Sequence, residues 1–325
     1  MPQPDDPTRI VNISSLNGTD VAHMESYAYP ASKAALNALT RQLAWRSNRV
    51  IRREILMLYH HYRRSPRDNP RERGPMNVPS LDEYSQRYEH IHFKREDGIL
   101  EVRLHSDGGE IIWDYLAHTE CSYVFEDINR DPENKVVILT GSGGAFIREE
   151  QIAGFQVTPE VWASVLVDAR RLLTSLLDVQ APMIAAINGP ATIHADLALL
   201  CDITIAAEHT VFADAPHALN GLVPGDGVHV VWPLLLGPNR ARYFLLTGQE
   251  IGAQDAKTLG VVNEVLPADE VLPRAWECAR MLRSRPEAAT RLTRSAMVHS
   301  IKKLMEDSLD YGLALEGLAA ISHWP

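Results

Sequence analysis

The sequence contains few cysteines and no long apolar run. These two features argue against a disulfide-rich, a zinc-binding and a membrane-spanning protein. Its 325 residues include three cysteines, Cys121, Cys201 and Cys278, which lie far apart and form no C-x-x-C pair. Neither a disulfide framework nor a zinc site is indicated, and a reducing cytosol is the simplest compartment. No apolar stretch approaches the length of a membrane span, and the opening residues do not resemble a signal peptide. We therefore expect a cytoplasmic protein with no membrane partner.

Positive charge is also scarce. The chain carries 32 lysines and arginines against 42 aspartates and glutamates, a net charge of −10. Because nucleic-acid binding depends on positive surfaces, a general nucleic-acid partner is not expected. Hydrophobic residues make up 45% of the chain, which is enough for a substantial core, and the length allows one large domain with an appendage or two modest domains.

The first 45 residues combine a β-branched strand with an amphipathic helix. They resemble the catalytic strand and helix of a short-chain dehydrogenase/reductase, in which Ser15, Tyr29 and Lys33 would be the catalytic residues. The Gly-rich strand–turn–helix that seats a dinucleotide is missing upstream. We therefore interpret residues 1–45 as a non-functional fragment that binds no NAD(P), appended by fusion or by a misplaced start.

Residues 46–79 differ in composition from the rest, because nine arginines and four prolines are concentrated there. Such a segment is typical of a solvated linker, although an Arg-rich run can also bind polyanions. The main domain is expected from residue 80 to residue 325. Within it, strands alternate with helices, which predicts an α/β fold with covered sheets.

The expected elements follow from periodicity and turn residues. Ile91–Arg95 and Ile99–His105 should form a hairpin around Asp97 and Gly98, which favour a tight turn. The other expected strands are Lys135–Thr140, residues 183–188 and residues 203–207, and the expected helices are Tyr115–Asn129, Pro159–Leu177 and residues 196–202. After Pro267 we expect three helices, with breaks at Pro286 and near Ser300.

The stretch from Phe212 to Trp232 contains residues that are typical of a catalytic site. His217 and Asp226 lie on either side of an apolar segment that glycines and a proline interrupt, a pattern typical of loops and turns. A chain that turns back there can bring Asp226 to the far nitrogen of His217. An imidazole oriented by a carboxylate can accept a proton from water near neutral pH. The alternative is a core histidine whose ring is satisfied by a backbone carbonyl.

Two motifs carry a family resemblance. N-G-P-A-x-x-x-x-D-L-A-L-L-C-D begins at Asn188, and the segment H-A-L-N-G-L-V-P-G-D-G begins at His217. In this order they resemble the crotonase (enoyl-CoA hydratase/isomerase) superfamily over roughly residues 80–325. The resemblance implies a spiral of ββα repeats and a helical tail, residues 267–325, that makes contacts in a homotrimer or a dimer of trimers.

The chain departs from ordinary CoA-dependent relatives at three places. Ile193, His194 and Ala195 replace consecutive glycines whose N–H groups help to hold a thioester oxyanion, and three charged residues occupy 148–150 where a tight turn is usual. His217 stands where hydratases carry one catalytic glutamate. Within the superfamily the pattern is most similar to β-diketone hydrolases of the 6-oxocamphor hydrolase type.

That resemblance implies further site residues. Trp113 would hydrogen-bond a substrate carbonyl, although an indole is more often part of a core. Phe155 would line an apolar substrate pocket. Glu316 lies on an otherwise apolar helical stripe, and its counterpart in the relatives is an active-site acid. The hypothesis is a retro-Claisen hydrolase of cyclic β-diketones that needs no metal or organic cofactor. His217, oriented by Asp226, activates water, His194 and Trp113 stabilise negative charge, and Glu316 assists proton delivery.

The residues leave open two functions other than hydrolysis of a β-diketone. Asp196 occupies the position of the hydratases' second catalytic glutamate, which keeps open an enoyl-CoA hydratase or isomerase acting on an acyl-CoA thioester. Asp196 can equally be a helix-start carboxylate that the helix dipole favours. The second alternative is a non-catalytic subunit in which the fold serves only as an oligomer scaffold.

Overall fold

An antiparallel hairpin opens the domain. In the computed structural model, strands β1 (Ile91–Glu96) and β2 (Ile99–Leu104) pair along their whole length. Asp97 and Gly98 connect them with φ angles of 48° and 76°, which a two-residue hairpin turn requires. The expected hairpin and its turn are confirmed.

The structure describes residues 79–151 and 157–323. The dehydrogenase-like fragment with Ser15, Tyr29 and Lys33, all of the linker before Pro79, and Phe155 lie outside the described residues. These described residues belong to one compact unit. Among the described residues, no helix is both long and apolar enough to cross a membrane.

A six-stranded sheet in the order β1-β2-β4-β6-β7-β10 forms the centre of the domain. Beyond the hairpin every neighbouring pair is parallel. The added strands are β4 (Val136–Gly141), β6 (Met183–Ile187), β7 (Ile203–Ala207) and β10 (Glu264–Leu266). All residues of β4 and β6 are buried, as expected for parallel strands that are covered on both faces.

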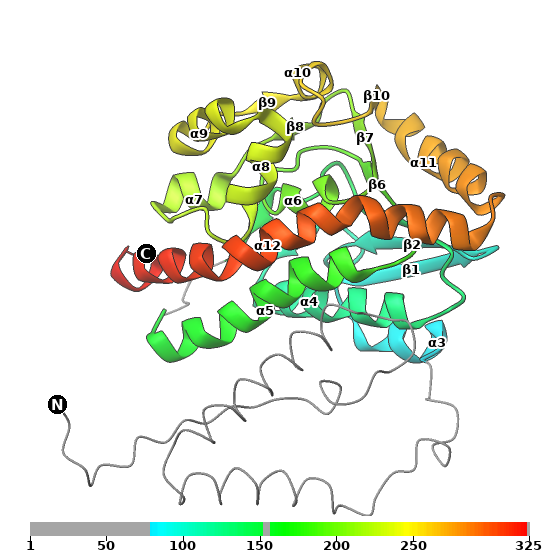
Figure 1. The fold of residues 1–325 in the computed structure, drawn as a ribbon, viewed down its shortest axis with the longest axis horizontal. Coiled ribbons are helices and arrows are strands. Elements are labelled where there is room, and N and C mark those ends of the chain that lie inside the picture. The colour runs from blue at the N-terminus through cyan, green and yellow to red at the C-terminus, as the bar shows by residue number, and fades with distance from the viewer. Residues whose placement is uncertain (1–78, 152–156, 324–325) are drawn as a thin grey trace, which may run out of the picture. The chain divides into compact units, whose positions relative to one another are not determined.

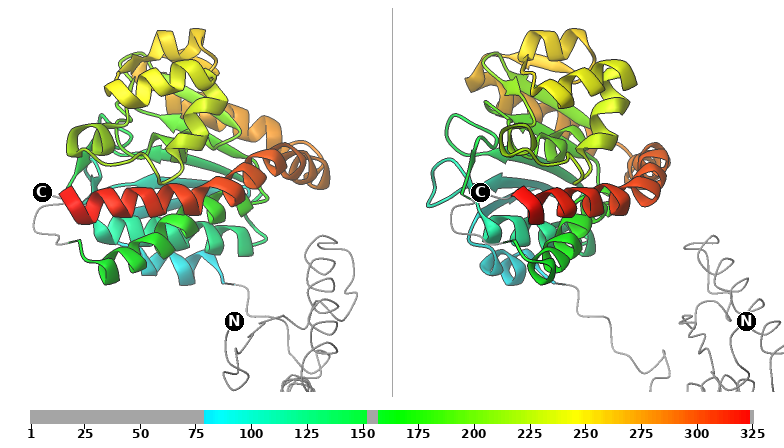
Figure 2. Two further views of the ribbon diagram at one scale, coloured as in Figure 1. Left: turned by 60° about the vertical axis from the view of Figure 1, so that its left-hand side comes forward. Right: turned by 90° about the vertical axis from the view of Figure 1, so that its left-hand side faces the viewer.

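Helices cover the two faces of this sheet (Figure 1). On one face α4 (Tyr115–Arg130), α5 (Pro159–Asp178) and α12 (Glu287–His323) contribute to the large core together with Val137 and Leu139. On the other face α11 (Ala268–Arg283) packs against the alternate residues of the same strands. The two further views in Figure 2 show α12 lying along α5 on that first face.

The remaining elements are short and connect or cap the sheet. They are α3 (Leu81–Tyr84), η2 (Ser85–Arg87), α6 (Ala195–Leu199), α7 (Ala215–Asn220), α8 (Val228–Leu236), α9 (Pro238–Thr247) and α10 (Ala253–Thr258). Two small pairs complete the set: β3 (Ile112–Trp113) is parallel to β5 (Glu149–Glu150), and β8 (Val211–Phe212) is antiparallel to β9 (Ile251–Gly252).

The expected helix boundary near Ser300 is wrong. The break at Pro286 is present, but α12 then continues without interruption from Glu287 to His323. No glycine or proline occurs between Glu287 and Gly312, and Ser300 is an exposed residue whose helix propensity is only modestly reduced. A single serine therefore does not end a helix that packs along α5.

Candidate active site

His217 lies on the short helix α7 (Ala215–Asn220), and a loop precedes and follows this helix. Helix α7 starts after Asp214 with Pro216 in its first turn and ends at Gly221, which has a φ of 65°. The chain then forms a loop to Gly227, whose φ of 114° is in the range that favours glycine, and α8 begins there. The expected turn is thus present, and it brings Asp226 back toward the imidazole.

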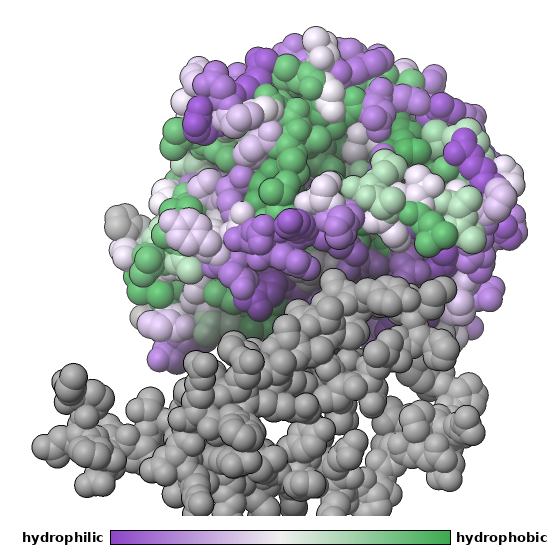
Figure 3. All heavy atoms as spheres, viewed as in Figure 1, coloured by the Kyte–Doolittle hydropathy of each residue, from purple (hydrophilic) through white to green (hydrophobic). Residues whose placement is uncertain are grey.

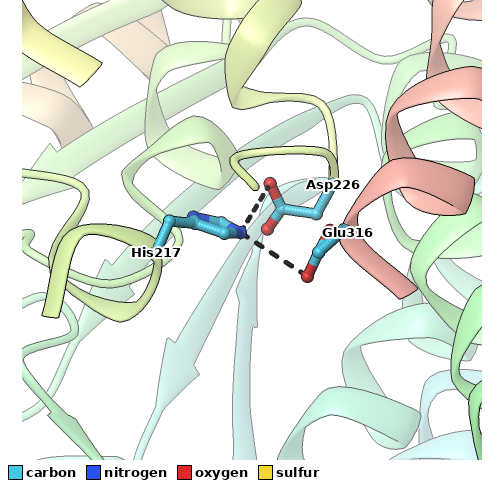
Figure 4. A group of neighbouring side chains, drawn as sticks. All are labelled: His217, Asp226 and Glu316. Atoms are coloured by element: carbon cyan, nitrogen blue, oxygen red, sulfur yellow. Dashed lines mark ion pairs between the residues drawn. The ribbon is translucent and has the colours of Figure 1, made fainter. Parts of the chain in front are cut away.

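The His217 ring contacts carboxylates through both nitrogens, and Figure 4 shows the two on the Nε2 side, Asp226 and Glu316. Its Nδ1 donates to Asp214 Oδ1 at 2.6 Å. On the other side, Nε2 lies 3.7 Å from Asp226 Oδ1 and 3.5 Å from Glu316 Oε1. Only 6% of His217 is exposed, so these interactions are poorly screened by solvent.

The orienting carboxylate differs from the expected one. Asp226 does lie at the far nitrogen, but at 3.7 Å it is beyond hydrogen-bond range, whereas Asp214 makes the short bond. The sequence reasoning missed Asp214. Its spacing was the available signal, because an aspartate three residues before a histidine at a helix start can reach the ring.

Glu316 reaches the cluster from the C-terminal helix α12. A close approach of two glycines sets its position: a Cβ on Gly225 would meet the backbone oxygen of Gly312, and a Cβ on Gly312 would meet that of Gly225. The loop before Asp226 therefore touches the helix backbone, and Glu316 follows one turn after Gly312. Its side chain is 8% exposed, so the carboxylate on the apolar stripe faces the site.

A second histidine lies on the other side of Asp226. His194 Nδ1 is 3.8 Å from Asp226 Oδ2 and 3.7 Å from Asp196 Oδ1. Its ring packs on Trp113 with the two centroids 4.5 Å apart. Asp226 therefore lies between two imidazoles, and the structure brings together five of the six expected residues; the sixth is Phe155.

Two further residues near the site escaped the sequence reasoning. His118 on α4 lies 6.0 Å from Trp113 and 5.9 Å from His194, measured between ring centroids. Glu150 pairs in register with Trp113 across β3 and β5. Two residues of the charged segment, Glu149 and Glu150, thus form the short strand β5, and Arg148 before it forms an ion pair of 2.7 Å with Glu110. A pairing of strands so far apart in sequence leaves no local pattern that could have predicted it.

Burial and charge set the protonation of these groups. Burial alone would lower the pKa of His217, but Asp226, Asp214 and Glu316 hold that pKa well above its ordinary value. Burial raises the pKa of Glu316 to about 7, with Asp226 adding to the rise and His217 opposing it. The burial of His118, together with the neighbouring His194, lowers the pKa of His118 to about 3. His217 and Glu316 therefore form a buried pair in which the pKa of each group is raised, whereas the pKa of His118 is lowered.

The cluster also offers acceptors to a small polar molecule. Asp226 Oδ1 and Glu316 Oε2 are buried and accept no hydrogen bond within the described residues. Ligand atoms of His217, Asp226 and Glu316 lie within 4.8 Å of one another, a spacing that a metal ion can bridge. His217 Nε2 faces both of these carboxylates, so the three side chains are also arranged for acid–base chemistry.

Comparison with protein families gives a consistent match. Residues 95–315 match the profile of the family described as enoyl-CoA hydratase/isomerase. A carnitinyl-CoA dehydratase from Citrobacter koseri is 31% identical to this chain, over 73% of this chain and 89% of the relative.

Solved structures of similar fold fall into two groups. A β-diketone hydrolase from the cyanobacterium Anabaena sp. PCC 7120, bound to (S)-3-oxocyclohexyl acetic acid, is 44% identical with a TM-score of 0.73. The match covers 76% of this chain and 99% of that one. An enoyl-CoA hydratase/isomerase from Mycobacterium paratuberculosis is 26% identical with a TM-score of 0.68, over 72% of this chain and 94% of that one.

Proposed function

We propose that this chain, which belongs to the enoyl-CoA hydratase/isomerase (crotonase) family, hydrolyses a carbon–carbon bond in a cyclic β-diketone. The observation that carries the proposal is the buried group of His217, Asp226 and Glu316 beside the His194–Trp113 pair. The β-diketone hydrolase of similar structure supports it, because its bound compound carries a ketone and a carboxylate. Those are the two groups that hydrolysis of a β-diketone generates.

The reaction is of the retro-Claisen type. A water molecule in reach of His217 Nε2 and Glu316 Oε1, which are 3.5 Å apart, gives a proton to this pair. Its oxygen attacks one ketone carbon, and the tetrahedral intermediate collapses with cleavage of the bond to the central carbon. The products are a carboxylic acid and an enolate, which takes back the proton at carbon. The second carbonyl is required, because it turns the departing carbanion into an enolate.

The protonation of His217 refines the role of each residue. A resting imidazolium cannot accept a proton, so the acceptor is the pair after it has lost one proton. Glu316, with a pKa of about 7, has the basicity that suits a general base near neutral pH. His217 then acts with Glu316 rather than alone, Asp214 fixes the orientation of the ring, and Asp226 balances its charge.

The second half of the site suits a developing oxyanion. His194 and Trp113 lie together opposite the proton-accepting pair, and both are donors on rigid rings. Fixed donors aimed at a developing negative charge are often the largest single contribution to catalysis. We assign the enolate oxygen to this side, and no organic cofactor or metal enters the scheme.

Action on an acyl-CoA thioester is the competing function. The carnitinyl-CoA dehydratase relative favours it, and so does the position of Asp196 in the chain. Against it, His194 adds a side chain where CoA-dependent relatives carry glycine, and Arg148, which precedes β5, forms a charged pair with Glu110. These two differences lie in the segments that hold a thioester oxygen in CoA-dependent relatives.

We include a homotrimer, or a dimer of trimers, and a cytoplasmic location in the proposal. Exposed apolar side chains gather on α7, α8 and α9, where Leu219 and Leu246 are 82% and 84% exposed (Figure 3). Contiguous apolar surface of this kind is typical of a contact between subunits. All three cysteines are free and buried, which suits a reducing compartment.

The test is a direct assay with two substrate classes. The purified chain is incubated with a bicyclic 1,3-diketone and, separately, with crotonyl-CoA, in water enriched in ¹⁸O. We expect a keto acid that carries one ¹⁸O in its new carboxylate and no hydration of crotonyl-CoA. Hydration of the thioester with the diketone untouched would establish the competing function. The His217→Gln variant in the same assay separates the site from background hydrolysis.

A further inference from the structure

Asp196 is a buried carboxylate without a conventional partner. It is 0% exposed, and neither of its oxygens accepts a hydrogen bond within the described residues. Two buried acids outside the site have conventional partners: Glu120 accepts from the backbone N–H groups of Glu89 and His90, and Asp131 binds Arg95 at 2.6 Å. A buried charge without hydrogen bonds is costly, so a carboxylate kept in this state needs a nearby cation.

The nearest cationic group is the imidazole of His194. Asp196 Oδ1 lies 3.7 Å from His194 Nδ1, and Asp226 Oδ2 approaches the same nitrogen at 3.8 Å. Both carboxylates therefore face Nδ1, which leaves Nε2 as the ring nitrogen that can meet a substrate oxygen. His194 holds this position with φ 43° and ψ 41°, a left-handed conformation that non-glycine residues adopt rarely and at some cost.

We propose that Asp196 is a positioning residue for His194: its buried carboxylate pairs with Nδ1–H and holds the ring as an imidazolium, whose Nε2–H then faces the enolate oxygen. This inference rests on the proposed function, because the enolate belongs to the β-diketone reaction. It assigns Asp196 a role through His194 rather than direct contact with a substrate.

The charges around His194 support a stable cation. The groups that face it from neighbouring elements are Asp196 on α6, Asp226 before α8, Glu150 on β5, Glu316 on α12 and the neutral His118 on α4. Burial alone would lower the pKa of His194, but Asp196, Asp226 and Glu150 overcome it and raise the pKa to about 9. Asp196 contributes the largest favourable part. The ring is thus protonated throughout the neutral range.

A cationic donor suits an enolate better than a neutral one. Hydrogen bonds from charged donors are roughly twice as strong as those between neutral groups. The gain appears only when negative charge develops on the substrate oxygen, so it should act on kcat more than on KM. The difference between a cationic and a neutral donor is worth about ten-fold in rate on this basis.

The test uses Asp196→Asn, which keeps the shape of the side chain and removes its charge. Histidines labelled with ¹³C are titrated by NMR in the wild-type chain and in the variant, and the His194 resonance is assigned by its loss in His194→Gln. We expect His194 to titrate at least one pH unit lower in Asp196→Asn. The alkaline limb of the pH–kcat profile should move down with it, and at pH values well above the lowered pKa of His194, kcat should fall by about ten-fold relative to a chain with a protonated ring, with little change in KM.

Asp168→Asn is the matched control, since Asp168 is also a buried acid, 8% exposed, but belongs to α5 outside the site. It should leave both the His194 titration and the pH profile unchanged. An unchanged His194 titration in Asp196→Asn overturns the inference, and so does a loss of activity whose pH profile keeps its shape. The NMR result needs no substrate, so a shifted His194 titration in a chain that cleaves no diketone would reject the proposed function and leave the pairing intact.

Discussion

The site contains two buried histidines, and their surroundings differ in a way that separates two kinds of chemistry. His217 has carboxylates on both sides of its ring, with a short bond to Asp214 on Nδ1 and two looser contacts on Nε2. His194 has carboxylates on Nδ1 alone, neither within hydrogen-bond distance, and its face packs on Trp113. The first arrangement orients a ring for proton exchange, whereas the second stabilises a cation and leaves one N–H for a ligand.

Removal of the proton-exchanging histidine should have the largest effect. In His217→Ala we expect kcat to fall by about 10²–10⁴, because that is the usual contribution of a positioned acid–base group. Steady-state kinetics on the diketone measures it. His92→Ala, which removes an exposed histidine on β1, serves as the control and should behave as wild type. A His217→Ala enzyme with normal kcat would mean that the pair does not activate water.

His194→Ala should cost somewhat less and should act differently. Loss of one oxyanion donor lowers kcat by about 10²–10³, and KM should change little because the charge forms mainly in the transition state. The split between kcat and KM is the measurement that matters. A raised KM with normal kcat would show that His194 contacts the ground-state substrate only.

Asp226 touches both histidines, so its removal should disturb both limbs of the pH profile. Asp226 raises the pKa of His217, of Glu316 and of His194, and Asp226→Asn should lower all three. The rate falls at low pH when the His217–Glu316 pair takes up a proton, so the acid limb should move to lower pH. The alkaline limb, set by loss of the His194 proton, should move in the same direction.

The double variant His217→Ala/Asp226→Asn tests whether Asp226 and His217 act as one catalytic unit or independently. Combined with His217→Ala, Asp226→Asn should add little further loss, because residues that act together are strongly non-additive. Strictly additive losses, or an acid limb that stays in place in Asp226→Asn, would show that Asp226 does not act through the pair. Asp196→Asn offers the contrast, since it should move the alkaline limb alone.

The sequence predicted the scaffold better than the detailed partnerships within the site. The hairpin, the buried strands and helices α4 and α5 follow from local periodicity and turn residues, and these were placed within a few residues. The break near Ser300 failed because one exposed serine cannot outweigh the packing of a long helix. The glycine-interrupted loop predicted that Asp226 would return to His217, which the structure confirms at Nε2.

What could not be predicted depends on contacts between distant segments. Asp214 is the exception, because it lies three residues before His217 and this spacing could have indicated the hydrogen bond within the short helix α7. Glu150 comes next to Trp113 only because β3 and β5 pair in parallel. His118 lies on α4 and His194 directly before α6, and their ring centroids are 5.9 Å apart. Phe155 lies outside the described residues, so its place in a substrate pocket stays a prediction.

The smallest expected effect concerns Trp113, on the His194 side of the comparison. Trp113→Phe keeps an aromatic ring against His194 but removes the indole N–H, so one neutral hydrogen bond to the enolate is lost. Such a bond is worth roughly 0.5–1.5 kcal/mol, which corresponds to about a two- to ten-fold fall in kcat. Both limbs of the pH profile should keep their positions, because no ionisable group changes. Trp113→Ala should fall further, since it also removes the surface on which the His194 ring packs at 4.5 Å. A shift of the alkaline limb in Trp113→Phe would contradict this assignment. It would mean that the indole, and not Asp196 alone, stabilises the protonated ring of His194.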